Sequence, residues 1–126
     1  MNDFPCPCCG FLTLPPPGSY EICRICGWGD DVSQLRFPRL AGGANRLSLL
    51  EAQRHFAHSG ASDPRRADLQ PPGPFDRRDS SWCPLDEVVD AIEDPVPGVD
   101  AGASYPSDLT TLYYWRPTFW RRPPAI

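Results

Sequence analysis

The clearest hydrophobic periodicity in the chain lies in residues 49–59. Apolar side chains recur there three and four residues apart, on one face of a helix: Leu49, Ala52 and Phe56. Ser48 stands just before this run and Glu51 three residues later, the spacing of a capping box that satisfies free backbone N–H groups. Gly60 is suited to end the helix. The pattern therefore predicts a helix over 49–59.

A second periodic run follows in residues 84–94. Its apolar stripe consists of Leu85, Val88, Val89 and Ile92. Pro84 fits the first position of a helix, which makes Cys83 the expected N-cap. The opposite face carries the acids Asp86, Glu87, Asp90, Glu93 and Asp94. We expect a second short helix with an acidic outer surface.

Two kinds of segment favour strands. Residues 11–14 and 20–22 are rich in apolar and aromatic residues, and the proline-rich run 15–19 between them is suited to a turn. These residues predict a hairpin. Residues 109–115 are rich in strand formers, and they predict a C-terminal strand.

Proline and glycine limit how far regular structure can extend. The chain has 17 prolines and 10 glycines among 126 residues, so we expect a thin core that needs a staple such as a metal ion. No apolar run approaches the roughly 18 residues of a membrane-spanning helix. The first residues resemble no export signal, so we expect a cytoplasmic protein that has no membrane partner and whose thiols stay reduced.

The cysteines are suited to bind such a stabilising metal ion. Cys6 with Cys9, and Cys23 with Cys26, form two C-x2-C pairs separated by thirteen residues, and a glycine follows each pair. Each pair places two thiolates on one side of a tight loop, so the two pairs together predict a closed four-thiolate site for one structural Zn²⁺.

Other uses of these cysteines stay open. A disulfide framework needs an oxidising compartment. A redox C-x-x-C normally follows a strand inside a βαβ unit, and a four-thiolate iron centre has the same geometry as zinc. Cys8, inside the first pair, is either packed beside the cluster or a reactive auxiliary thiol.

Four blocks of the chain, in order, resemble the bacterial cysteine-rich CPCC family. They are residues 6–14, residues 18–31, residues 42–52 and residues 56–61. The family usually has an acidic residue after the tryptophan of the second block, where this chain has Gly29. The resemblance extends over roughly residues 3–75 and implies a small metal-binding domain without a known activity.

Charge is unevenly distributed along the chain, whose formal net charge is −4. Residues 79–108 carry eight acids and no base. Acidic surfaces steer association with basic partners, so we expect a non-enzymatic, zinc-stabilised protein-binding module, in concrete form an immunity protein that blocks a basic toxin. The aromatic and arginine residues near the end have the composition of a binding hot spot, unless they supply the core. The expected contact residues are Asp86, Glu87, Asp90, Glu93, Asp94, Trp115 and Trp120.

An alternative from another class is a zinc ribbon that binds nucleic acid or assists transcription or translation. It would use the arginines Arg24, Arg36, Arg39 and Arg46. The net acidity disfavours this alternative. No catalytic triad or phosphate-binding loop motif appears, so we expect no enzyme activity; a redox role of the cysteine pairs is the disfavoured alternative.

The expected architecture is a small, loop-rich α+β fold: a zinc-ribbon-like hairpin, two short helices and a C-terminal strand. We divide the chain into three parts. Residues 1–62 form the metal-binding domain and residues 63–80 a proline- and arginine-rich loop or linker. Residues 81–126 contribute the acidic helix and an aromatic strand that packs on the first part.

Overall fold

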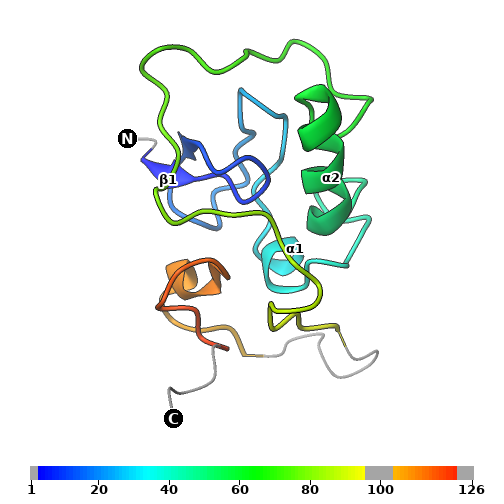
Figure 1. Ribbon diagram of the computed structural model, residues 1–126. Coiled ribbons are helices and arrows are strands. Elements are labelled where there is room, and N and C mark those ends of the chain that lie inside the picture. The colour runs from blue at the N-terminus through cyan, green and yellow to red at the C-terminus, as the bar shows by residue number, and fades with distance from the viewer. Residues whose placement is uncertain (1–2, 96–103, 122–126) are drawn as a thin grey trace.

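The computed structural model describes residues 3–95 and 104–121 (Figure 1). Its regular elements are short: β1 (Phe4–Pro5), β2 (Leu12–Leu14), α1 (Val32–Arg36), α2 (Leu49–Ser59) and the 3-10 helix η1 (Leu109–Leu112). The remaining described residues form turns and loops. The small, loop-rich α+β fold expected from the sequence is therefore confirmed.

Helix α2 begins and ends where the sequence predicts. The Ser48 hydroxyl accepts a hydrogen bond from the Glu51 N–H at 3.1 Å, and the Glu51 carboxylate accepts one from the Ser48 N–H at 3.2 Å. Gly60 ends the helix in the left-handed conformation. Leu49 and Ala52 are fully buried. The local capping chemistry and the apolar face therefore agree, and the prediction is confirmed.

The expected pairing of residues 11–14 with 20–22 is wrong. Strand β2 pairs antiparallel with β1, on the other side of the first cysteine pair, while Ile22 forms a bridge with Gly29 across the second pair. The Asp30 carboxylate accepts hydrogen bonds from the Gly18 and Tyr20 N–H groups and holds the intervening turn toward residue 30. The residues before each cysteine pair therefore pair with the residues that follow the same cysteine pair.

The helix expected over 84–94 is also wrong. Only a turn forms at residues 87–89, although the Asp90 N–H does donate to the Asp86 carbonyl at 2.9 Å. The side chains of Asp86 and Asp90 accept local backbone N–H bonds, which competes with continuing a helix. Val88 and Val89, members of the predicted apolar stripe, are exposed instead of buried.

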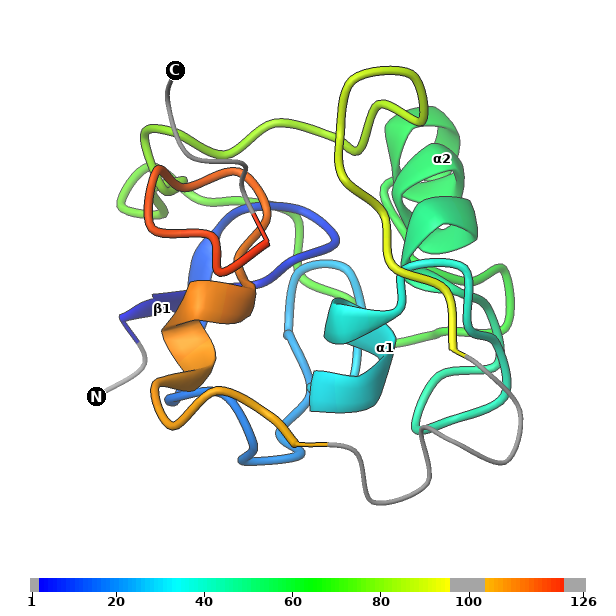
Figure 2. The same ribbon diagram turned by 90° about the horizontal axis from the view of Figure 1, so that it is seen from below.

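The C-terminal strand is replaced by η1. The Asp108 carboxylate accepts hydrogen bonds from the Thr110 N–H at 3.0 Å and from its hydroxyl, which starts a helical turn where the residue preferences favoured a strand. Helix α1 was not predicted; Asp31 caps it by accepting from the N–H groups of Ser33 and Gln34. Helices α1 and η1 contact each other, and Figure 2 shows them side by side.

One core joins the early and late parts of the chain. It contains the five N-terminal cysteines together with apolar side chains from residues 14–52 and from residues 112–115. Tyr113 stacks on Trp115 with 4.8 Å between ring centroids, and Tyr114 meets Trp115 edge-on. The aromatic block therefore supplies core. Residues 96–103 and 122–126 of the predicted part 81–126 lie outside the described residues.

Candidate metal centre

The first cysteine pair lies on a loop that the backbone closes on itself. In this first knuckle, residues 6–10, the Gly10 N–H donates to the Cys6 carbonyl at 2.7 Å. The Cys6 N–H donates in turn to the Phe11 carbonyl at 2.8 Å. Gly10 has φ +82°, a left-handed conformation that is unfavourable for residues other than glycine. The glycine after the pair therefore makes the tight turn possible.

The second knuckle, residues 23–27, repeats this arrangement. The Gly27 N–H donates to the Cys23 carbonyl at 2.9 Å, and the Cys23 N–H donates to the Trp28 carbonyl at 2.8 Å. Gly27 has φ +85°. Two separate stretches with the pattern C-x2-C-G thus adopt the same backbone.

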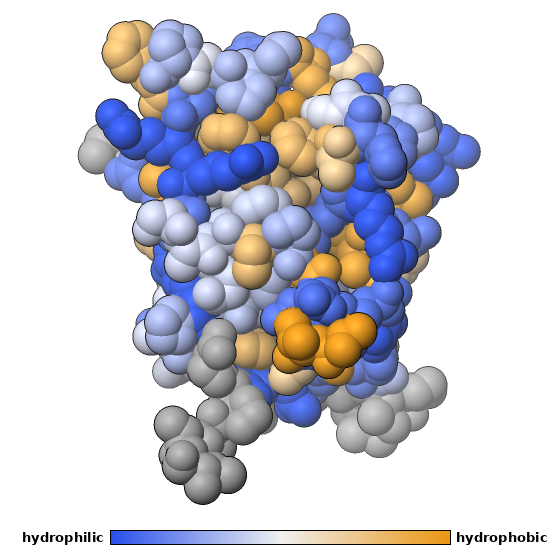
Figure 3. All heavy atoms as spheres, viewed as in Figure 1, coloured by the Kyte–Doolittle hydropathy of each residue, from blue (hydrophilic) through white to orange (hydrophobic). Residues whose placement is uncertain are grey.

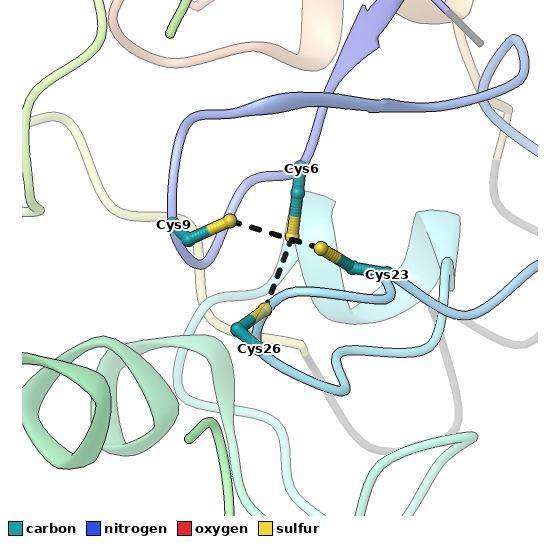
Figure 4. A group of neighbouring side chains, drawn as sticks. All are labelled: Cys6, Cys9, Cys23 and Cys26. Atoms are coloured by element: carbon teal, nitrogen blue, oxygen red, sulfur yellow. Dashed lines mark hydrogen bonds between the residues drawn. The ribbon is translucent and has the colours of Figure 1, made fainter. Parts of the chain in front are cut away.

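The two knuckles bring four sulfur atoms together (Figure 4). All four Sγ atoms lie within 4.8 Å of one another, and they belong to Cys6, Cys9, Cys23 and Cys26. The Sγ–Sγ distance is 3.5 Å for the pair Cys6 and Cys26, and 3.8 Å for the pair Cys9 and Cys23. Tetrahedral Zn²⁺ with Zn–S bonds of about 2.3 Å would separate its sulfurs by about 3.8 Å. The four residues predicted as ligands therefore fit a tetrahedral metal ion.

The cluster is closed to solvent. The side chains of all four cysteines are fully buried. A metal ion held by four buried thiolates has no position left for water or a substrate, which is the arrangement of a structural site. The chemistry of such a site is to hold two segments of chain together.

Polar groups around the cluster support negative charge on sulfur. The Thr13 hydroxyl donates to Cys23 Sγ at 3.0 Å, and the backbone N–H of Trp28 donates to Cys26 Sγ at 3.4 Å. Such bonds orient thiolate ligands and stabilise them. The Thr13 bond crosses from the strand after the first knuckle to a sulfur of the second.

Without a bound metal ion, the buried cysteine thiols do not all ionise readily. Burial raises the pKa of Cys6 and of Cys26 well above the usual range. Hydrogen bonds, the largest with Cys26 and the next with Cys6, lower the pKa of Cys23. Burial therefore favours the protonated thiols of Cys6 and Cys26, whereas the hydrogen bonds favour the thiolate of Cys23. Binding a divalent cation to all four sulfurs must release protons.

Cys8 is buried beside the four sulfurs but does not belong to the set within 4.8 Å. Burial raises the pKa of its thiol, which disfavours the reactive thiolate form. These observations favour the packed role among the two that the sequence left open. Cys83, by contrast, is exposed.

The segment after α2 covers both knuckles, and sequence reasoning missed this role. Figure 1 shows it running from α2 to the side of β1 and then back across the molecule. The Arg78 Nε–H donates to the Cys9 carbonyl at 2.9 Å, and the Trp82 indole N–H donates to the Pro7 carbonyl at 3.0 Å. The Ser62 N–H donates to the Cys26 carbonyl at 2.7 Å. No local motif signals such contacts, since they join residues far apart in sequence.

Most of the predicted acidic contact residues lie in ion pairs within the chain. Glu87 pairs with Arg39 and Arg54, Glu93 with Arg36 and Arg121, and Asp94 with Arg39. Asp86 and Asp90 form no ion pair among the described residues. Three of the five predicted acidic contact residues are thus paired with arginines, which come from residues 36–54 and from position 121.

The two predicted aromatic contact residues differ. Trp115 is only 6% exposed, so it lies in the core and offers a partner almost no surface, contrary to the expectation. Its indole N–H donates to the Asp79 carboxylate at 2.9 Å. Trp120 is partly exposed, and the Arg36 guanidinium lies 4.9 Å from its ring centroid.

The four arginines of the nucleic-acid alternative are also paired. Their partners are Asp76 for Arg24, Glu93 for Arg36, Asp94 and Glu87 for Arg39, and Asp63 for Arg46. A guanidinium already bound to a carboxylate is a weaker ligand for phosphate. The structure therefore adds no support to this alternative.

Comparison with known proteins agrees with the pattern of the cysteines. The family model described as "Cysteine-rich CPCC" matches residues 4–73, which is more than half of the chain. None of the curated proteins matches the chain. Within the residues that the structure describes, no helix has the length and apolar character needed to cross a bilayer.

Proposed function

The chain belongs to the cysteine-rich CPCC family, and on this premise we propose that it is a non-enzymatic, zinc-stabilised module that binds a protein. The single observation that carries the proposal is the closed set of four buried sulfurs, because a saturated metal ion can stabilise a fold but cannot meet a substrate. The cytosol is the proposed compartment, since reducing conditions keep the thiols available as ligands.

The proposed contact surface is the valine tip, which we define as Val88 and Val89. Their side chains are 90% and 74% exposed. Figure 3 shows a strongly hydrophobic patch low on the face drawn there, where this segment lies. Two adjacent exposed valines on one turn gain free energy when a partner covers them, about 1.5–3 kcal/mol for each fully buried side chain.

Hydrogen bonds and ion pairs link the valine tip to its neighbours. The Asp86 N–H donates to the Asp90 carboxylate at 2.7 Å, and the Val88 N–H donates to the Asp86 carboxylate at 2.9 Å. Glu87 ties the turn to Arg54 of α2 and to Arg39. These contacts reduce the conformational entropy that the turn loses on binding, which favours affinity.

Charge beside the tip indicates the chemistry of the partner. Asp86 and Asp90 flank the valines, and no arginine of the described residues pairs with either carboxylate. The whole chain is acidic at −4, and a zinc ion with four thiolates would bring it to about −6. A basic protein with an apolar pocket is the complementary partner, and a toxin that attacks nucleic acid, blocked by an immunity protein, is its most concrete form.

The test is affinity capture with a matched control. The metal-loaded full chain is used as bait in host lysate at low salt, with and without nuclease, as wild type, as Val88→Ser/Val89→Ser and as Phe75→Ser. Phe75 is a suitable control because it is equally exposed, at 91%, and lies outside the tip. We expect a stoichiometric protein that survives nuclease, binds wild type and Phe75→Ser, and is lost from the double variant.

Other results would overturn parts of the proposal. Equal capture by all three baits would show that the valine tip is not the contact surface. Recovery of nucleic acid alone, or of proteins that nuclease removes, would favour the zinc-ribbon alternative. Once the protein is purified, its association rate with the chain should fall as salt rises, because the attraction is electrostatic.

A further inference from the structure

A small cavity lies beside the second knuckle, away from the valine tip. Its volume is about 10 Å³, and its lining includes Trp28, which directly follows the knuckle glycine. About this much space admits one water-sized group. The polar residues that line it are Asn45, Arg46, Ser62, Asp63 and Arg66.

The Trp28 indole is left with an unpaired donor. Its side chain is 1% exposed, and its Nε1 is the one buried side-chain nitrogen or oxygen in residues 3–95 and 104–121 that has no hydrogen-bond partner. An unpaired buried N–H is costly, so proteins rarely keep one without an acceptor. Trp28 lines the cavity, so an acceptor held there within reach of Nε1 would remove this cost.

Two of the other lining residues are already engaged. The Asn45 amide donates to the Gly29 carbonyl at 2.7 Å and accepts from the Gly29 N–H at 2.7 Å. The Asp63 carboxylate accepts two bonds from Arg46, at 3.0 Å and 2.8 Å, and one from the Arg65 N–H at 2.9 Å. These contacts fix the walls of the cavity and neutralise its single acid.

Arg66 brings an additional positive charge. Its aliphatic stem covers the second knuckle, since a Cβ added at Gly27 would lie 2.8 Å from Arg66 Cγ. No acid among the described residues forms an ion pair with its guanidinium. The lining therefore has two guanidinium groups against one carboxylate, and an excess of donors over free acceptors.

We propose that this cavity is a binding site for an anionic oxygen, of a carboxylate or a phosphate, which accepts from the Trp28 indole N–H and from the Arg66 guanidinium. Its size admits one oxygen atom, so the rest of the anion lies outside the cavity. A hydrogen bond to an anionic oxygen is stronger than a hydrogen bond to the neutral oxygen of water. This difference favours the anion over a water molecule as the acceptor. The site is independent of the function proposed above.

The first experiment follows the Trp28 indole directly. The metal-loaded full chain, with assigned ¹⁵N signals of its tryptophan indoles, is titrated with inorganic phosphate in one series and acetate in another, at constant ionic strength. We expect the Trp28 indole signal to shift saturably in at least one series, while the Trp115 indole, bonded to Asp79, stays unchanged. The two series distinguish a phosphate ligand from a carboxylate. The absence of a saturable shift in both would overturn the proposal in favour of water.

Matched variants separate a specific site from general charge effects. Arg66→Gln keeps the Cγ group over Gly27 but removes the charge, and it should weaken binding by about tenfold or more. Arg65→Gln removes the same charge from the neighbouring residue, which does not line the cavity, and should leave binding unchanged. Equal weakening by both variants would show a diffuse electrostatic effect and overturn the site.

Discussion

The two knuckles have the same backbone but different surroundings. Residues 6–10 and 23–27 close with the same pair of hydrogen bonds, and the two glycines have φ within 3° of each other, at +82° and +85°. The first knuckle is covered by the rigid ring of Trp82, the second by the flexible side chain of Arg66. Sequence-local chemistry therefore made the loops alike, and distant residues made them different.

The largest expected effect tests what the knuckles have in common. Cys9→Ser and Cys26→Ser each remove one ligand and should both prevent stable folding, because structural metal binding is worth on the order of 10 kcal/mol of folding free energy. Metal content and thermal unfolding are the measurements. A chelator in excess should unfold the wild type in the same way.

Cys8→Ala is the matched control for these ligand variants. Cys8 is equally buried but lies outside the four-sulfur set, so this variant should keep its metal and a cooperative melt. Loss of metal from Cys8→Ala, or its retention by Cys9→Ser, would show that the ligand assignment is wrong.

The next largest effect is the difference in stability cost between alanine substitutions in the two knuckles. Alanine is strained at both glycines, but its Cβ at Gly10 would lie 2.5 Å from the Trp82 ring, whereas at Gly27 it would meet the movable Arg66 stem at 2.8 Å. We expect Gly10→Ala to cost about 2–5 kcal/mol and Gly27→Ala about 1–2 kcal/mol. Denaturant unfolding of both metal-loaded variants measures the difference. Equal costs would mean that the coverings do not distinguish the knuckles.

A smaller effect concerns the bond that joins the two knuckles. Thr13→Val removes the hydroxyl that donates to Cys23 Sγ and should lower metal affinity about tenfold. Thr13→Ser keeps the hydroxyl and is the control. Competition with a chromogenic chelator gives the affinities. If the two variants bind metal equally well, the hydroxyl does not stabilise the thiolate.

The smallest effect concerns the ion pair beside the second knuckle. The hydrogen bonds from Arg46 lower the pKa of the Asp63 carboxyl below its usual range. Because the pKa is lower in the folded than in the unfolded state, the pair stabilises the fold at neutral pH. This contribution decreases as the pH falls below the unfolded pKa and is lost once the pH has fallen through the folded pKa. Arg46→Gln should raise the pKa of Asp63, which a ¹³C NMR titration of the carboxyl measures. An unchanged pKa would show that the ion pair contributes little.

Predictability from sequence varied with the range of the interactions involved. The cysteine pairs and the capped helix 49–59 were predicted, because contacts within a few residues decide a knuckle turn and a capping box. The stripe at 84–94 and the strand-forming block at 109–115 were misleading. In the first, carboxylates of Asp86 and Asp90 bind the local backbone, and in the second, Asp108 caps a helical turn.

The candidate surfaces show the same limit. Sequence placed eight acids in residues 79–108, but did not indicate which of them would be paired: Asp79, Glu87, Glu93 and Asp94 have arginine partners from positions 36–54 and the C-terminal block. Trp115 was expected to contact a partner, because aromatic residues are common in binding hot spots, but it lies in the core. Pairing and burial depend on which segments meet, and a one-dimensional pattern does not contain that information.

The sequence by itself determined the four candidate metal ligands, the form of both knuckles and the position of α2, because each depends on residue identity and short spacing. Only the tertiary structure decided which strands pair, what covers each knuckle, which charges remain unpaired and where an indole N–H is left without an acceptor. Those features arise when four sulfurs fix two loops together and the proline-rich remainder of the chain packs around them, so that contacts between distant residues outweigh local preference.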